Sequence, residues 1–212
     1  MPISRRQKLL EFSEHNDSFI IEDDYDSELR YYEKPVPALK SKDYPDRVIY
    51  LGTFSKILSP SFRMSYIVLP EQFTDGFLEK FKLHNSTVNL INQIALANVL
   101  SSGDYDRLVR KMNHIFKKRY EAFQDGFDSF QIPIKVSHNV SGQYFLVNFP
   151  TKINQSEMIK RALDEGVKVY DTMQFWQDEA ECPHEHLFLG FSKIELEDIP
   201  DCMKRLKKAW DI

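Results

Sequence analysis

The sequence of 212 residues contains few glycines, and they are widely spread. The closest two of its seven glycines, Gly126 and Gly142, lie 16 positions apart. The G-x-G-x-x-G loop of dinucleotide-binding folds and the Walker A loop both need closely spaced glycines to bring the backbone against phosphates. Both of these phosphate-binding motifs are therefore excluded.

Cysteines and long apolar runs are also scarce. Cys182 and Cys202 are the only cysteines, too few for a disulfide framework and without C-x-x-C spacing. No apolar run approaches the roughly 20 residues of a membrane span. The N-terminal residues Met-Pro-Ile-Ser-Arg-Arg lack the apolar segment of a signal peptide, so we expect a cytoplasmic protein.

Basic charge is in slight deficit. The sequence has 28 Lys and Arg against 32 Asp and Glu, which gives a net charge of −4. Because nucleic-acid binding requires a basic surface, the composition argues against DNA binding by this chain itself.

Hydrophobic patterning predicts an α/β chain. Short runs of β-branched and aromatic residues predict strands at 18–21, 48–51, 64–69, 132–136, 143–149, 168–170 and 187–191. Helical periodicity predicts helices at 4–15, 71–84, 89–101, 104–130 and 155–165, and a last helix that ends at Trp210. We expect two lobes joined through the long helix, with a boundary near Leu108.

An acidic segment, Glu22 to Glu28, follows the first predicted strand. In open α/β sheets, ligands bind at the carboxyl ends of the strands. One hypothesis is a magnesium site made by Asp23, Asp24 and Asp26, because Mg²⁺ prefers carboxylate oxygens. The segment could also be a solvated acidic turn, or it could hold one carboxylate apart to pair with a cation.

Lys56 lies just beyond the second predicted strand, after Thr53 and Ser55, and Arg63 follows it by seven positions. An aldehyde cofactor that bears a phosphate requires this set of groups. The amine forms a Schiff base, while hydroxyls and a guanidinium bind the phosphate oxygens. A carboxylate such as Asp23, placed opposite a ring nitrogen, keeps that nitrogen protonated and makes the ring an electron sink.

Several segments resemble one family: Ile21–Tyr31, Pro37–Leu39, Arg47–Lys56, Pro60 with Arg63, Leu69–Pro70 and Leu187–Ser192. They are similar to the aminotransferase-like domain of MocR/GabR-type bacterial regulators, which join a GntR-type winged-helix DNA-binding domain to a fold-type I pyridoxal-phosphate (PLP) domain. The resemblance implies that residues 1–108 form the C-terminal half of the PLP-binding large domain, with a mostly parallel sheet. Residues 109–212 would form the small C-terminal α+β domain.

The resemblance also implies roles for individual residues. Asp23 matches the carboxylate that pairs with the pyridine nitrogen, and Tyr25 matches the phenol that hydrogen-bonds the ring oxygen. Lys56 matches the Schiff-base lysine. Thr53 and Ser55 match the hydroxyls on the phosphate side, and Arg63 matches the phosphate-binding arginine. We expect Asp24, Asp26 and Glu28 to be structural.

Two departures from the family pattern stand out. Phe188 occupies the place where members that bind an amino-acid carboxylate have an arginine. The chain also matches the family only from the middle of the PLP domain onward. We therefore expect a C-terminal fragment that retains PLP weakly or not at all.

The favoured hypothesis is an effector-sensing domain, in which PLP and an amino compound shift the domain between two states. The alternative is a working aminotransferase that uses Lys56 as acid and base. The resemblance implies a homodimer, with DNA bound only through a winged-helix domain absent from this chain.

Cys182, His184 and His186 lie on one short loop with no distant fourth ligand, so we expect no metal site. Phe175 and Trp176 are expected to be core residues.

Overall fold

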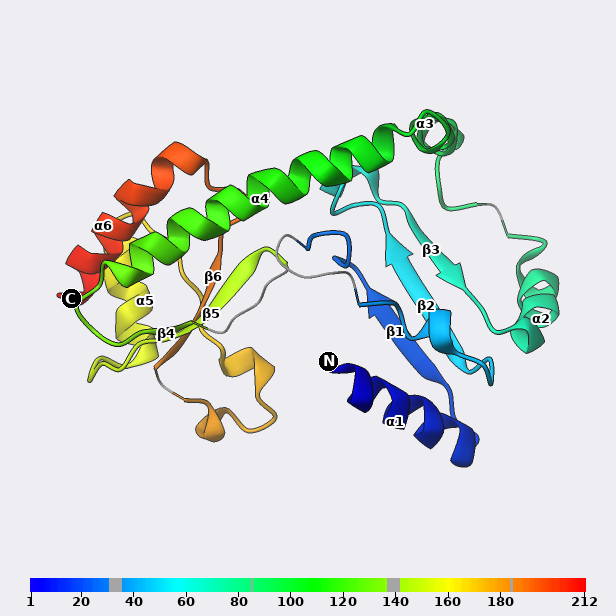
Figure 1. Ribbon diagram of the computed structural model, residues 1–212, viewed down its shortest axis with the longest axis horizontal. Coiled ribbons are helices and arrows are strands. Elements are labelled where there is room, and N and C mark those ends of the chain that lie inside the picture. Colours follow the sequence, from blue (N-terminus) through cyan, green and yellow to red (C-terminus); the bar gives the residue numbers. More distant parts are fainter. Residues whose placement is uncertain (31–35, 85, 137–141, 184) are drawn as a thin grey trace. The chain divides into compact units, whose positions relative to one another are not determined.

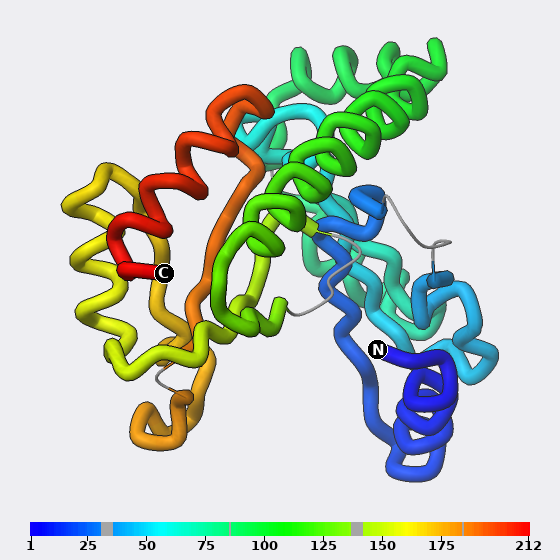
Figure 2. The backbone as a smooth tube through the Cα atoms, turned by 60° about the vertical axis from the view of Figure 1, so that its left-hand side comes forward, coloured from blue at the N-terminus to red at the C-terminus, as the bar shows by residue number. Residues whose placement is uncertain are grey.

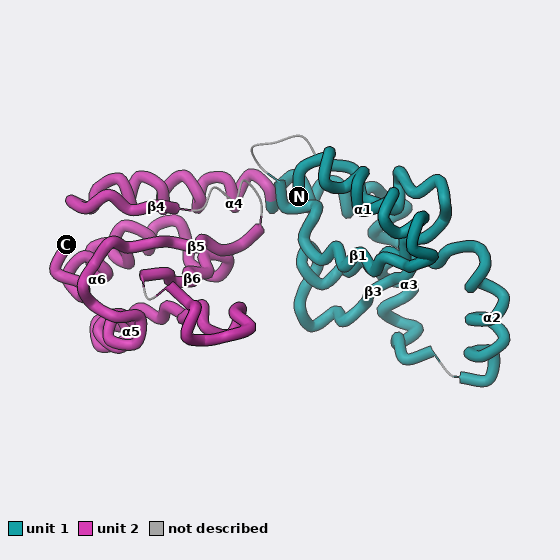
Figure 3. The backbone as a smooth tube through the Cα atoms, turned by 90° about the horizontal axis from the view of Figure 1, so that it is seen from below, with its two compact units in different colours: residues 1–112 teal, residues 113–212 magenta. Residues whose placement is uncertain are grey.

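The computed structural model describes residues 1–30, 36–84, 86–136, 142–183 and 185–212. Tyr31 and His184 lie outside the described residues. The described chain divides into two compact units, Met1–Met112 and Asn113–Ile212 (Figure 3). Within this part of the chain, no helix combines the length and the apolar character that a bilayer crossing requires.

The first unit contains a three-stranded sheet and surrounding helices (Figure 1). Its elements are α1 (Ile3–His15), β1 (Ile20–Asp24), β2 (Val48–Thr53), β3 (Ser65–Val68), α2 (Glu71–Phe81), α3 (Leu90–Ser101) and the beginning of α4 (Asp104–Asp128). The sheet order is β1-β2-β3. β1 and β2 are parallel, and β2 and β3 are antiparallel.

This small sheet corrects two expectations from the sequence. The described sheet is mixed rather than mostly parallel, because the link from Thr53 to Ser65 is too short for the crossover that a parallel neighbour needs. β1 also extends through Asp24, so three of the acidic residues lie inside the strand and not beyond its end. Their side chains therefore alternate between the two faces of the sheet.

Partly buried polar contacts attach α1 and the 36–47 connection to β1. The Glu22 carboxylate accepts hydrogen bonds from the backbone N–H groups of Leu39 at 2.8 Å and Lys40 at 3.1 Å. Arg6 of α1 forms an ion pair with the same carboxylate at 3.3 Å. Glu22 is thus a structural residue that holds the first helix and this connection against the sheet.

The second unit contains the rest of α4 and a second three-stranded sheet. Its other elements are β4 (Lys135–Val136), β5 (Tyr144–Asn148), α5 (Gln155–Asp164), β6 (His186–Gly190) and α6 (Ile199–Trp210). The order is β4-β5-β6, with both pairs antiparallel. The strand expected at 168–170 is wrong: only Tyr170 forms a bridge, to Phe188. Pairing stops there because the Asp171 side chain accepts from Met173 N and turns the chain.

Aromatic side chains fill the core of the second unit. Phe145 of β5 is fully buried, and its ring lies within 5.6 Å of the rings of Phe123, Phe127 and Phe191. α5 and α6 run side by side (Figure 2). At their contact the indole N–H of Trp210 donates to the Met158 carbonyl at 3.0 Å. The apolar stripe predicted for the long helix is therefore the inner wall of this core.

Candidate functional site

The predicted site residues lie on the end of β1 and in the loop between β2 and β3. Asp23 is in β1, and Tyr25 follows the end of that strand. Thr53 ends β2, and Lys56 lies in the turn that follows. Because β1 and β2 are parallel, both turns leave the same edge of the sheet, as ligand sites in α/β sheets require.

Strand alternation separates Asp23 from its acidic neighbours. The strand register pairs Asp23 with Leu51 and Asp24 with Gly52, so the two carboxylates point to opposite faces. Asp24 Oδ2 accepts a hydrogen bond from the Tyr50 hydroxyl at 2.8 Å. Asp23 instead lines a hollow of about 360 Å³, together with Leu51, Thr53, Ser65 and Ile67.

The alternation does not support the magnesium hypothesis. Adjacent carboxylates on opposite faces of a strand cannot ligate one ion. Within the described ranges, no group of three or more His, Cys, Asp or Glu side chains is placed to hold a metal. In the second unit, the buried Cys182 Sγ lies 3.2 Å from Thr172 Oγ1.

Lys56 contacts Tyr25. The Lys56 ammonium nitrogen lies 5.5 Å from the centre of the Tyr25 ring, a distance at which a cation is attracted to the aromatic face. Both side chains are exposed. The ammonium makes no hydrogen bond or ion pair with any described residue. The amine is therefore accessible and lies beside the phenol that the family resemblance assigned to the same site.

Asp26 adds a partly buried carboxyl near this lysine. Burial raises the pKa of Asp26 above its usual range, and the negative charge of Asp24 raises it further. The positive charges of Lys56 and Arg30 act in the opposite direction on this pKa. Asp26 therefore contributes to the electrostatic surroundings of Lys56, although the sequence assigned it only a structural role.

Thr53 and Ser55 have different roles in the turn after β2. The Thr53 hydroxyl donates to the Met64 carbonyl at 3.1 Å and accepts from the Ser55 N–H at 3.2 Å. Its proton is thus already used within the turn. The Ser55 hydroxyl has no partner among the described residues. Ser55 can donate to an anion, whereas Thr53 shapes the turn that presents it.

Arg63 follows the short 3₁₀ helix Pro60–Phe62 in a left-handed backbone conformation, with φ of 46°. Its guanidinium is exposed and has no hydrogen bond or ion pair to any residue the structure describes. The short loop between β2 and β3 therefore carries two exposed cations without a hydrogen bond or ion pair to the described residues, Lys56 and Arg63, and the Ser55 hydroxyl. This is a set of donors suited to a phosphate group.

Three tyrosines support the site but were not singled out in the sequence. Tyr50 binds Asp24, and the Tyr105 hydroxyl donates to Glu28 Oε1 at 3.0 Å. The Tyr66 ring lies directly over Gly52, where a Cβ would be 2.3 Å from the ring carbon Cζ. The only available sequence signal was Gly52 itself, because glycine inside a strand often marks a close approach of another group.

In the second unit, Phe188 lies among aromatic rings. Its ring centre is 4.6 Å from that of Tyr144, 5.8 Å from Phe175 and 6.3 Å from Tyr170. Phe175 is 65% exposed and Trp176 is 40% exposed, so the expectation that both are core residues is wrong. They lie on a turn that begins at Asp171, outside the packed helices.

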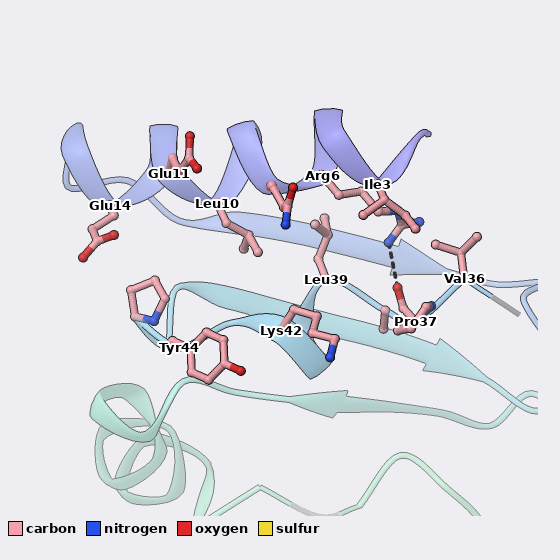
Figure 4. A pocket seen from close by; sticks show the side chains of 13 residues that line it. Ile3, Arg6, Leu10, Glu11, Glu14, Val36, Pro37, Leu39, Lys42 and Tyr44 are labelled. Atoms are coloured by element: carbon pink, nitrogen blue, oxygen red, sulfur yellow. Dashed lines mark hydrogen bonds between the residues drawn. The ribbon is translucent and has the colours of Figure 1, made fainter.

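A groove of about 510 Å³ lies elsewhere on the first unit, between α1 and residues 36–45 (Figure 4). Ile3 and Leu10 of α1 face Leu39 across it, and Arg6 donates to the Pro37 carbonyl at 3.1 Å. None of the predicted site residues lines this groove.

Comparison with known proteins places the chain in a family. No protein-family model matches the sequence. The HTH-type transcriptional regulator YdeL of Bacillus subtilis is 36% identical over 100% of this chain, and the MocR protein of Rhizobium meliloti, a probable rhizopine catabolism regulator, is 30% identical over 99% of it. The chain belongs to the family of MocR-type transcriptional regulators. It spans 46% of the length of YdeL and 42% of the length of MocR.

The fold of this MocR-type chain is that of fold-type I aminotransferases. The kynurenine aminotransferase of Pyrococcus horikoshii matches 100% of the chain with a TM-score of 0.86 and 28% identity, over 52% of its own chain. The multiple substrate aminotransferase of Thermococcus profundus matches equally, with a TM-score of 0.86 and 29% identity. The solved Pyrococcus enzyme contains PMP, an amine form of the PLP cofactor.

Proposed function

We propose that this chain is part of the PLP-binding, effector-sensing domain of a MocR-type regulator, and that Lys56 binds PLP covalently. One observation carries the proposal. Asp23, Lys56 and Arg63 have no hydrogen bond or ion pair to any described residue. By contrast, neighbouring carboxylates are engaged: Glu22 with Leu39 N and Asp24 with Tyr50.

This difference matters because a charged side chain without a hydrogen bond or ion pair to the protein is available to a ligand. Glu22 and Asp24 are hydrogen-bonded within the fold, whereas the exposed Asp23 carboxylate is not. Asp23, Lys56 and Arg63, which the family resemblance assigned to the cofactor, are among the charged side chains left available in this way. The residues present therefore fit PLP.

In this proposal, each residue binds a different group of the cofactor. Lys56 would hold the aldehyde carbon of the cofactor covalently through its amine, with loss of water. Asp23 pairs with the ring nitrogen, and Tyr25 hydrogen-bonds the ring oxygen. Ser55 and Arg63 bind the phosphate, in the turn that Thr53 holds. When bound, PLP supplies an electron-accepting ring and an electrophilic carbon for an amino compound.

The effector in this proposal is an amino compound. An effector shifts the domain only as far as it binds one state better than the other. Because Phe188 stands among aromatic rings where carboxylate-binding relatives have arginine, recognition of this effector does not depend on an arginine–carboxylate pair at that position.

Trapping with borohydride, in a full-length protein that carries this sequence, tests the PLP proposal. Borohydride delivers hydride to the C=N carbon and converts the linkage to a stable secondary amine, which peptide mapping locates. We expect Lys56 to be labelled preferentially over Lys40 and Lys42, and the labelling to fall in Asp23→Asn but not in Asp24→Asn. Even labelling of all surface lysines, or labelling that is independent of Asp23, would overturn the proposal.

A working aminotransferase is the alternative, because this chain shares its fold with the aminotransferases of Pyrococcus horikoshii and Thermococcus profundus. The experiment is steady-state formation of keto acid from amino donors by a full-length protein that carries this sequence. Turnover abolished by Lys56→Ala would favour the enzyme. Labelling of Lys56 without turnover would favour the sensor.

We further propose that the functional form is a homodimer that binds DNA only through a winged-helix domain outside this sequence. Exposed apolar side chains on the first unit support an association surface, with Leu90 and Ile91 of α3 each more than two-thirds exposed. Sedimentation should show a dimer that Ile91→Glu weakens. A monomer at all concentrations would contradict this part of the proposal.

A further inference from the structure

Tyr105, in the first turn of α4, contacts both turns that carry the proposed PLP ligands. Its hydroxyl donates to Glu28 Oε1 at 3.0 Å, and Glu28 lies three positions after Tyr25. Its ring packs edge-on against Phe54, with centres 5.8 Å apart and an angle of 81° between the ring planes. Phe54 stands between Thr53 and Ser55. One side chain therefore joins the turn after β1 to the turn after β2.

We propose that Tyr105 is a positioning residue that sets the spacing of these two turns, so that Tyr25 and Lys56 can engage one PLP molecule. The inference rests on the proposed function and extends it to a helix that the family resemblance did not include. Tyr105 acts through Glu28 and Phe54 and has no direct contact with the cofactor in this proposal.

Two hydrogen bonds within the turn after β1 connect residues only three positions apart. Leu29 N donates to the Asp26 carbonyl at 3.0 Å, and Arg30 Nε donates to the Ser27 carbonyl at 2.9 Å. These bonds define the shape of the turn but not its position relative to Lys56. The Tyr105–Glu28 bond joins segments 77 positions apart, so it restricts where the whole turn lies.

Tyr105 keeps the proton that this bond requires. Burial raises the pKa of the Tyr105 phenol well above its usual value of 10, and the negative charge of Glu28 raises it further. The hydroxyl therefore remains a donor at neutral and moderately alkaline pH. Its acceptor is a carboxylate, which makes the bond stronger than one between neutral groups.

Thermodynamic linkage makes the coupling reciprocal. If the Tyr105–Glu28 bond favours PLP binding by some factor, PLP binding favours the bond by the same factor. An occupied site would therefore stabilise the first turn of α4. The stability of the first turn of α4 would therefore depend on whether PLP occupies the site.

The first experiment compares Tyr105→Phe with Tyr44→Phe as a matched control. The Phe variant at position 105 keeps the ring contact with Phe54 and removes only the hydroxyl. Tyr44 is 93% exposed and its hydroxyl has no hydrogen bond to the described residues. In PLP titrations of a full-length protein that carries this sequence, followed by the absorbance of the bound cofactor, we expect roughly three- to tenfold weaker binding for Tyr105→Phe. Tyr44→Phe should bind PLP as the wild type does.

Variants of Glu28 separate positioning from general stability. Glu28→Gln retains an acceptor and should keep most of the PLP affinity, whereas Glu28→Ala should weaken it. In the Glu28→Ala background, Tyr105→Phe should have no further effect, because the two residues act through one bond. Fully additive effects of the two substitutions, or wild-type PLP affinity in Tyr105→Phe, would overturn the inference.

Amide hydrogen exchange gives a readout that needs no turnover. PLP should slow exchange at residues 104–108 in the wild type and leave it unchanged in Tyr105→Phe. If wild-type Lys56 is not trapped by borohydride, the proposed function fails and this inference falls with it. If Lys56 is trapped but Tyr105→Phe behaves as the wild type in affinity and exchange, the positioning role alone is wrong.

Discussion

The Tyr50 hydroxyl donates to Asp24 Oδ2 across 2.8 Å, on the face of the sheet opposite to Asp23. This bond determines which of two adjacent carboxylates is available to a ligand. Asp24 is used by the fold, whereas Asp23 faces a hollow without a bonded partner among the described residues. A shift of the β1–β2 register by one residue would exchange the roles of Asp23 and Asp24, because each side chain would move to the other face of the sheet.

Removal of the Tyr50 hydroxyl should lower stability. Tyr50→Phe leaves Asp24 without its donor and should cost about 1 kcal/mol of unfolding free energy, measured by urea denaturation. Asp23→Asn should leave this free energy within about 0.5 kcal/mol of the wild type, because it breaks no bond in the fold. Equal losses in both variants would contradict the assignment of the two carboxylates.

The same tyrosine should make the protein sensitive to alkaline pH. Burial and the hydrogen bond to Asp24 raise the pKa of Tyr50 above its usual value of 10. The unfolded chain then loses this proton at lower pH than the folded chain, so stability falls as pH rises above about 10. Thermal unfolding as a function of pH should show this slope in the wild type. The slope should be smaller in Tyr50→Phe.

Gly52 should not tolerate a side chain. A Cβ at this position would lie 2.3 Å from Cζ of the Tyr66 ring, so Gly52→Ala must displace the ring or the strand. We expect a loss of about 1–3 kcal/mol in unfolding free energy. Gly76→Ala is the control, because no atom lies within 4 Å of its added Cβ in α2. That variant should gain about 0.5–1 kcal/mol.

Asp26 should lower stability at neutral pH. Its pKa is raised above the usual 3.8, chiefly by burial, so the folded state holds a proton that the unfolded chain releases at lower pH. The free energy of unfolding should therefore decrease as pH rises from about 3.8 through the raised pKa. Asp26→Asn should remove this slope and be more stable than the wild type at pH 7. Parallel profiles for the two proteins would show that Asp26 is not perturbed.

The sequence predicted much of the fold because local patterns determine most of these elements. The apolar stripe of α4 and the run Val48–Leu51 are strong periodic signals, and both elements are present. The short pairing at Tyr170 was predicted as a strand because alternation alone does not reveal the turn that the Asp171 side chain closes.

The site was harder to predict because it depends on contacts between distant segments. Motif spacing selected Asp23, Lys56 and Arg63, which the structure leaves unpaired within its described residues. The Tyr105–Glu28 hydrogen bond joins residues 77 positions apart, and local sequence patterns do not predict contacts between segments so far apart. The exposure of Phe175 was missed for a similar reason: its aromatic side chain predicts a core residue, and only the tertiary packing shows that it is exposed.

The aromatic core of the second unit should be the most sensitive to truncation. Phe145 is fully buried, and Phe145→Ala would leave a cavity among the rings of Phe123, Phe127 and Phe191. We expect a loss of about 3–5 kcal/mol in unfolding free energy. Phe175→Ala, at a side chain 65% exposed, should change it by less than about 0.5 kcal/mol. Comparable losses in the two variants would mean that Phe175 is covered in solution, and that the aromatic rings around Phe188 are part of an interface.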